Sequence, residues 1–242
     1  MKTLPHFPLS LFPPIPGAKW LRCDLHVHTP FDHEKRFGED IQAAIEALKK
    51  ADTTRLAGIA ERFIQACLNG ANGQGVHLVA LTDHNSIEGF KRLSPFFHSI
   101  SQRLKDEGKV APVVLPGVEF SVGGERPIHF LVIFAKDTEP EQIEGCIRHV
   151  FGTSEPFDPD SGTPRATGHS VDDFLKKLYE YCHPSSGDRH LSFVVLPAHA
   201  DGNSGIAKTT GAHLPQGIAA NIWQEMKGHL RQWVVTLSLI HI

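Results

Sequence analysis

Short apolar runs that carry no polar residue constrain the fold of this chain more than any other feature. Two of them are Leu78–Leu81 and Phe193–Leu196. Runs of this kind are typical of strands buried on both faces, as in a barrel or a doubly wound sheet. Helical patterns separate the apolar runs along the chain, and this alternation predicts an α/β fold with a mainly parallel sheet.

The spacing of apolar and turn-forming residues divides the chain into expected elements. The expected strands are residues 20–29, 76–82, 113–122, 128–135 and 192–198. The expected helices are residues 39–50, 53–69, 86–107, 140–150, 171–181 and 218–227, and Pro95 is expected to bend or split the third of them. Gly-rich loops are expected at residues 70–75, 151–169 and 201–217.

The composition argues against several classes of protein. Lys and Arg number 24 against 27 Asp and Glu, and this net charge of −3 offers no broad basic surface to nucleic acid. No apolar run approaches the roughly 20 residues that a membrane span needs. The four cysteines form no CxxC pair, which is typical of reduced, mostly buried thiols and predicts a cytoplasmic protein with no membrane partner.

Histidine is unusually frequent, with 16 among 242 residues. Imidazole binds metals and moves protons near neutral pH. His26 and His28 are two positions apart on an expected strand, so their side chains should point to one face and share a metal ion. Leu25 and Val27 should then pack on the other face. The alternative is a pair of exposed histidines on an edge strand.

Other metal-binding side chains follow the ends of expected strands. Asp32 and His33 come soon after the histidine pair, and a short turn would bring them back to the same site. Asp83 and His84 directly follow the next strand, with one as a ligand and the other as its hydrogen-bonding partner. The alternative for Asp83 is the N-cap of the following helix.

Glu119 lies inside an apolar strand, where a carboxylate is costly unless it is paired or bound to a metal. It is therefore a candidate bridging ligand, and the alternative is a salt bridge to a nearby Arg or Lys. His129 opens the next expected strand and His199 closes the last. These two histidines are credible ligands only in company with the others.

Together, these positions predict a metal centre that does chemistry. The candidate ligands are His26, His28, Asp32, His33, His84, Glu119, His129 and His199, and the candidate catalytic residues are His26, His28, Asp83, His84 and Glu119. Carboxylates and imidazoles without thiolate suit Zn, Mn or Fe. The ligands exceed the needs of one tetrahedral ion, which predicts two or three divalent ions. Clustered divalent ions acidify a bridging water and hold phosphoryl oxygens, as in the hydrolysis of phosphate esters.

At these residues the chain resembles the PHP family (polymerase and histidinol phosphatase). The matching motifs are DLHVHT at 24–29, TDHN at 82–85, GVEF at 117–120, IHFLV at 128–132 and LPAHAD at 196–201. The resemblance covers about residues 19–201. It implies a distorted (β/α)7 TIM-like barrel with a trinuclear metal site at the C-terminal ends of the strands. The implied ligands are His26, His28, His84, Glu119, His129 and His199, with Asp32 or His33 in the early-turn position.

The resemblance also bears on the ends of the chain. Residues 17–20 followed by DLHVHTP look like a PHP subgroup that carries this domain N-terminal to a large ATPase of the chromosome-segregation type. Members of the family close the site with a late Asp-x-His motif, and none follows His199 here.

The expected layout has three parts. They are a Pro-rich extended segment over residues 1–18, an incomplete PHP phosphoesterase domain over residues 19–236, and a non-native tail over residues 237–242. The tail sequence LSLIHI resembles a translated adaptor from DNA library preparation. The alternative for this end of the chain is a genuine last strand over residues 233–240.

The expected function is metal-dependent hydrolysis of a phosphomonoester or of a nucleic-acid phosphodiester. The expected partners are that substrate, which includes nucleotides and nucleic acid, and a C-terminal ATPase region. One alternative is a non-catalytic metal-binding PHP module that docks on an ATPase or a polymerase. Another is an amidohydrolase-like barrel, which usually enlists a Lys at a strand end, and the candidate site contains none.

Overall fold

The computed structural model describes residues 22–32, 52–69, 75–124, 127–184 and 190–198. Its elements, in chain order, are β1 (Cys23–Val27), α2 (Thr53–Asn69), β2 (Leu78–His84), α3 (Glu88–Asp106), β3 (Val113–Val122), β4 (Ile128–Phe134), α4 (Pro140–Phe151), α5 (Val171–Cys182) and β5 (Phe193–Pro197). The helices expected over 39–50 and 218–227, the loop expected over 201–217 and both terminal segments of the expected layout lie outside the described residues. No described helix combines the length and the apolar character that a membrane crossing requires.

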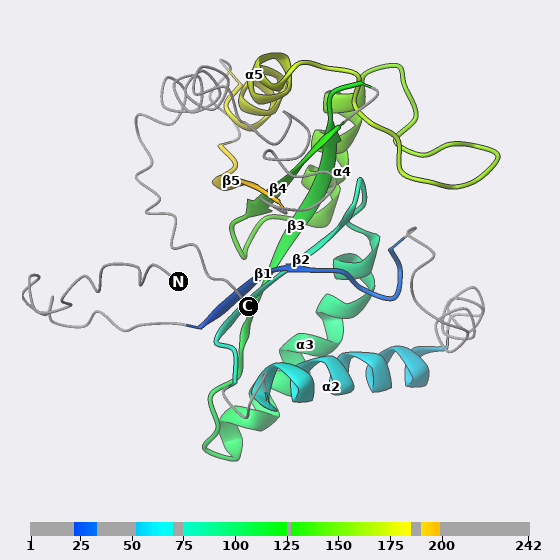
Figure 1. Ribbon diagram of the computed structural model, residues 1–242. Coiled ribbons are helices and arrows are strands. Elements are labelled where there is room, and N and C mark those ends of the chain that lie inside the picture. The colour runs from blue at the N-terminus through cyan, green and yellow to red at the C-terminus, as the bar shows by residue number, and fades with distance from the viewer. Residues whose placement is uncertain (1–21, 33–51, 70–74, 125–126, 185–189, 199–242) are drawn as a thin grey trace, which may run out of the picture.

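The fold is mixed α/β, as predicted, and its five strands lie in the order β1-β2-β3-β4-β5 (Figure 1). The prediction of a mainly parallel sheet holds only for β1, β2 and β3. The pairs β3–β4 and β4–β5 are antiparallel. Only residues 123–127 join β3 to β4, and a parallel connection needs a crossover of roughly a dozen residues or more. A hairpin is therefore the geometry that this link allows.

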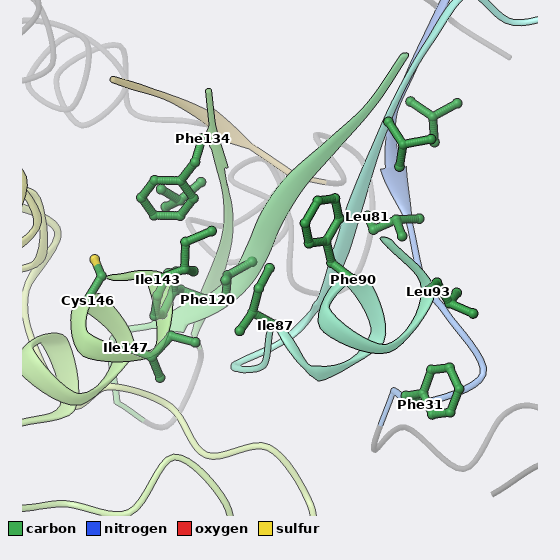
Figure 2. Close-up of a cluster of buried hydrophobic side chains, with 14 of the residues drawn as sticks. Phe31, Leu81, Ile87, Phe90, Leu93, Phe120, Phe134, Ile143, Cys146 and Ile147 are labelled. Carbon is green, nitrogen blue, oxygen red and sulfur yellow. The ribbon is translucent and has the colours of Figure 1, made fainter. Parts of the chain in front are cut away.

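One face of the sheet packs against the helices. Val118, Phe120 and Val122 alternate along β3 and belong to a single buried cluster with residues of α2, α3, α4 and α5. The Phe174 ring of α5 lies 5.3 Å from the Phe120 ring and 5.9 Å from the Phe130 ring. Figure 2 shows part of this cluster, where side chains of the strands meet those of α3 and α4. Each large apolar side chain buried here contributes about 1.5–3 kcal/mol.

The other face of the sheet begins apolar and ends polar. Its smaller apolar cluster contains Ala80, Leu131, Ile133 and Ala198, with Leu25, Leu115 and Leu196 packed against it. Further along the same face, Thr82 pairs in register with Gly117 and His84 with Glu119. Polar side chains thus follow an apolar floor toward the C-terminal ends of β2 and β3.

β1 contains a bulge that changes how its side chains alternate. The register with β2 shifts between Asp24 and Val27, where β1 has one residue more than its neighbour. Leu25 consequently packs on the smaller apolar cluster, whereas Val27 packs on the helix side. The prediction that Leu25 and Val27 share a face is wrong for this reason. A bulge next to a functional site typically re-aims a side chain, here that of His26.

Capping residues fix the starts of two helices. At α4, the Glu139 side chain accepts from the N3 backbone, the Gln142 side chain accepts from the N-cap backbone, and Pro140 occupies the first turn. At α5, the Ser170 hydroxyl accepts from the Asp173 backbone N–H. Each cap satisfies donors that would otherwise lack a partner.

α3 continues through Pro95, so the predicted split of this helix is wrong. Pro95 lies on the exposed side of α3. Buried residues on both sides of it hold the helix against the core, namely Phe90, Leu93, Phe97 and Ile100. Tertiary packing therefore overrides the local preference to break at proline.

Replacing Pro95 by Ala is expected to stabilise the protein by about 1–2 kcal/mol. Alanine restores the missing hydrogen bond to the Lys91 carbonyl, and this gain exceeds the unfolded-state entropy that proline removes. Thermal unfolding should show a melting temperature higher by roughly 2–8 °C. An unchanged or lower melting temperature would contradict this account, and Ser94→Ala on the same helix serves as the matched control.

Candidate metal centre

The candidate residues come from four neighbouring strands at one edge of the sheet. β2 ends at His84, which lies opposite Glu119 of β3. His129 lies near the start of β4, and because β4 is antiparallel to β3, this start meets the end of β3. His26 and His28 lie in and just after β1, which is parallel to β2. The topology therefore brings residues distant in sequence to one place.

Glu119 is the residue that connects these strands, and its side chain is fully buried. One carboxylate oxygen, Oε2, lies 2.8 Å from His26 Nε2, 3.1 Å from His28 Nε2 and 3.4 Å from His84 Nε2. The other oxygen, Oε1, lies 2.5 Å from His129 Nδ1. A cationic Arg or Lys partner, the alternative raised by the sequence, does not occur among the described neighbours of this carboxylate. Its printed partners are all imidazoles.

Asp32 is the second buried carboxylate of the site. Its Oδ2 contacts His28 Nδ1, lies 3.0 Å from His84 Nδ1 and accepts from the His84 backbone N–H at 3.2 Å. The rings of His28 and His84 stack with centroids 4.7 Å apart and an interplanar angle of 10°. Asp32 therefore occupies the early-turn position. His33 and His199 lie outside the described residues.

The electrostatics of the site favour bound cations. Burial alone would raise the pKa of Glu119, but hydrogen bonds from the surrounding imidazoles hold it well below its usual range. Burial alone would lower the pKa of His28, but the hydrogen bonds to Asp32 and Glu119 raise it to about 10. The pKa of His84 is also raised against the effect of burial, chiefly through its hydrogen bond to Asp32. Two buried negative charges thus require positive partners, which are protons or metal ions.

Three groups of ligand atoms lie close enough together for each group to hold an ion. Within each group the atoms lie within 4.8 Å of one another. The first group is His26, His28 and Glu119, the second is His28, Asp32 and His84, and the third is His84, Glu119 and His129. Each pair of groups shares one residue. We refer to these six residues as the His–carboxylate cluster.

The donors of the His–carboxylate cluster fit a divalent metal. In the first group the three atoms are separated by 2.8, 3.1 and 3.1 Å. Ligand atoms about 2.0–2.1 Å from one tetrahedral ion lie about 3.3 Å apart, close to these separations. Imidazole nitrogens and carboxylate oxygens without thiolate suit Zn, Mn or Fe.

Asp83, which the sequence placed among the catalytic candidates, belongs to none of the three groups. Adjacent strand residues face opposite ways, so Asp83 points away from the side that His84 faces. Its Oδ1 accepts from the Thr29 backbone N–H and its Oδ2 from the Thr29 hydroxyl, both at 2.6 Å. Burial raises the pKa of Asp83 to about 6.

Gly89 is a site residue that the sequence analysis missed. A Cβ added at Gly89 would lie 2.1 Å from Asp83 Oδ2 and 2.1 Å from Thr29 Oγ1. Only a residue without a side chain lets the first turn of α3 approach this pair. A glycine early in an expected helix is unfavourable by about 1 kcal/mol relative to alanine, and this cost was the clue in the sequence.

Asn85 is a second missed residue, and it joins the cluster to a distant loop. Its backbone has a positive φ of 49°. Its side-chain amide donates to the carbonyls of Pro156 and Arg165, at 2.9 and 2.8 Å. Asn is enriched at positive φ, so the residue type pointed to the turn but not to the loop that it holds.

Replacing Gly89 by Ala is expected to destabilise the protein by about 1–3 kcal/mol, because the new methyl overlaps two buried oxygens. The helix propensity of alanine would offset part of this loss. A denaturant titration measures the change in unfolding free energy. Gly58→Ala in α2 is the matched control, because a Cβ there meets only Arg62 at 3.7 Å and should stabilise. Equal effects at the two positions would contradict the crowding at Gly89.

Comparisons with known proteins leave the class of this chain open. No known protein family matches it, and no curated protein is significantly similar to it. Similarity is found to the solved structure of an amidohydrolase from Chromobacterium violaceum with bound sulfate and no metal. The identity is 16%, over 66% of this chain and 50% of that one, with a TM-score of 0.30.

A second solved structure comes from Bifidobacterium adolescentis, and its activity as a metal-dependent phosphoesterase is itself inferred. The identity is 15%, over 92% of this chain and 58% of that one, with a TM-score of 0.26. The chain thus spans little more than half the length of either structure. Because both TM-scores are low, neither likeness carries a conclusion about fold or function.

Proposed function

We propose that this chain is a PHP-type metal-dependent phosphoesterase, which hydrolyses a phosphomonoester or a nucleic-acid phosphodiester. One observation carries the proposal: the three ligand groups share His28, His84 and Glu119. Ions held by groups that share ligands would be close neighbours. Neighbouring divalent ions suit the displacement of a phosphate ester, because they stabilise both the attacking and the leaving oxygen.

The proposed ligands are the six residues of the His–carboxylate cluster, with His33 and His199 as further candidates from the sequence. Two or three ions of Zn, Mn or Fe would supply Lewis acidity toward phosphoryl oxygens and a water of lowered pKa. The five motifs of the sequence analysis support the PHP assignment, since His26, His28, His84, Glu119 and His129 each lie in one of them.

The two carboxylates orient the imidazoles. Asp32 contacts Nδ1 of both His28 and His84. This leaves the Nε2 atoms of both rings facing Glu119, at 3.1 and 3.4 Å. Carboxylate–imidazole hydrogen bonds fix both the tautomer and the orientation of a ring and increase its basicity as a ligand. The site is thereby organised before substrate arrives.

We propose a cytoplasmic location and, from the resemblance, association with an ATPase or polymerase region. The thiols support a reducing compartment, because all four cysteines are free. A PHP module that binds metal without turnover would fit the same partners. The substrate assay below separates the two functions.

The experiment is hydrolysis of p-nitrophenyl phosphate and bis-p-nitrophenyl phosphate by the purified chain with added Mn²⁺. We expect turnover that vanishes on chelation and falls about 100-fold or more in His28→Ala, which damages two ligand groups. His98→Ala, at an exposed position of α3, should leave the rate unchanged. Mn²⁺ binding without turnover of either ester would favour the docking module. Turnover of p-nitroacetanilide alone would favour an amidohydrolase.

A further inference from the structure

We infer that Asp83 is a positioning residue, which holds the turn after β1 so that Asp32 reaches the second ligand group. The inference rests on the proposed function only in requiring that the groups bind metal. Asp32 belongs to the second group alone. Asp83 should therefore control one metal position and leave the other two intact.

The first line of support is the pair of hydrogen bonds between Asp83 and Thr29. Both carboxylate oxygens accept from Thr29, one from its backbone N–H and one from its hydroxyl, at 2.6 Å each. Both residues are 2% exposed. A buried carboxylate with two donors from one residue fixes both the backbone and the χ1 angle of that residue.

The second line of support is the connection from Thr29 to Asp32. The Thr29 carbonyl accepts from the Asp32 backbone N–H at 3.1 Å. The Thr29 hydroxyl, which donates to Asp83, also accepts from the Phe31 N–H at 3.1 Å. Phe31 is itself anchored in the main apolar cluster. The position of Asp32 is thus set by a turn whose first residue is held by Asp83.

Helix capping, the simpler explanation, does not account for Asp83. The N-cap of α3 is Ile87, which makes no side-chain capping bond. Thr29 is the printed hydrogen-bond partner of both Asp83 oxygens. Gly89 lets α3 close over the pair, because any side chain there would overlap Asp83 Oδ2 and Thr29 Oγ1. The packing of α3 is arranged around this contact and does not use it as a cap.

The test is a titration of the full chain with Mn²⁺, followed by calorimetry and by melting temperature. The unaltered chain should bind three equivalents. In Asp83→Ala one equivalent should weaken by about 10–100-fold, while the other two keep their Kd within threefold. Thr29→Val, which keeps the backbone N–H bond, should weaken the same equivalent less, and Thr29→Ser should restore it. Glu88→Gln, an exposed carboxylate in the first turn of α3, is the matched control.

A double variant separates positioning from general damage. If Asp83 acts through Asp32, adding Asp83→Ala to Asp32→Asn should cause no further loss of Mn²⁺. Equal weakening of all equivalents, or three unchanged equivalents in Asp83→Ala, would overturn this inference and leave the proposed function standing. Absence of Mn²⁺ binding by the unaltered chain would overturn both. If Asp83→Ala does not fold, Thr29→Val gives the same comparison.

Discussion

Replacing Glu119 by Gln is expected to lower phosphoesterase activity about 1,000-fold or more. Gln keeps the shape of the side chain but removes the charge that the first and third ligand groups share. Loss of about 4 kcal/mol of charge stabilisation corresponds to this change in rate. Elemental analysis should show the metal content reduced by the two ions that depend on Glu119.

The same variant should also melt earlier without metal. Removing one partner of a buried ionic cluster costs roughly 3 kcal/mol, or about 6–12 °C for a chain of this size. The matched control is Glu144→Gln, whose surface ion pair with Lys91 at 2.9 Å contributes at most about 1 kcal/mol. If Glu119→Gln retained its full metal content, the ligands would have to be assigned elsewhere.

Complete removal of metal by a chelator is expected to abolish activity and to lower the melting temperature by about 5–11 °C. An ion present at 100 times its Kd stabilises the folded state by about 2.7 kcal/mol, and each kcal/mol shifts the melting temperature of a chain of this size by about 2–4 °C. Scanning calorimetry with and without chelator measures the shift, and added Mn²⁺ should reverse it.

Two controls make the chelation result specific. Mg²⁺ should not restore the melting temperature, because it prefers oxygen ligands in octahedral geometry and the cluster is rich in imidazole. Glu119→Gln should respond to chelation much less than the unaltered chain. A melting temperature that is the same with and without chelator would show that the cluster holds no ion under these conditions.

Periodicity predicted the elements better than their pairing. The apolar runs and helical faces placed β3 and α2 at their observed bounds, Val113–Val122 and Thr53–Asn69. The antiparallel β3–β4 pair was foreseeable from its short link, but the overall strand–helix alternation outweighed that link. The bulge in β1 was not, because it depends on the register with β2 and not on the residues of β1 alone.

The candidate site shows the same division between local and non-local information. The two-residue spacing of His26 and His28 brought both rings to one side, with their Nε2 atoms 3.1 Å apart. The roles of Thr29 and Gly89 could not be predicted, because they arise from a contact across 54 positions of the chain. The orientation of Asp83 was open for the same reason: alternation allowed two assignments for the Asp83–His84 pair.

The β3–β4 hairpin has a consequence for the order in which the chain folds. Glu119 and His129 are ten residues apart, whereas Glu119 and His26 are separated by 93. Loop-closure entropy grows with separation, so the hairpin pair should form early and the docking of β1 late. The third ligand group is complete without β1 and would hold an ion before the first and second groups exist. We therefore expect Mn²⁺ to accelerate refolding in stopped-flow experiments, and to do so equally in a chain that carries His26→Ala.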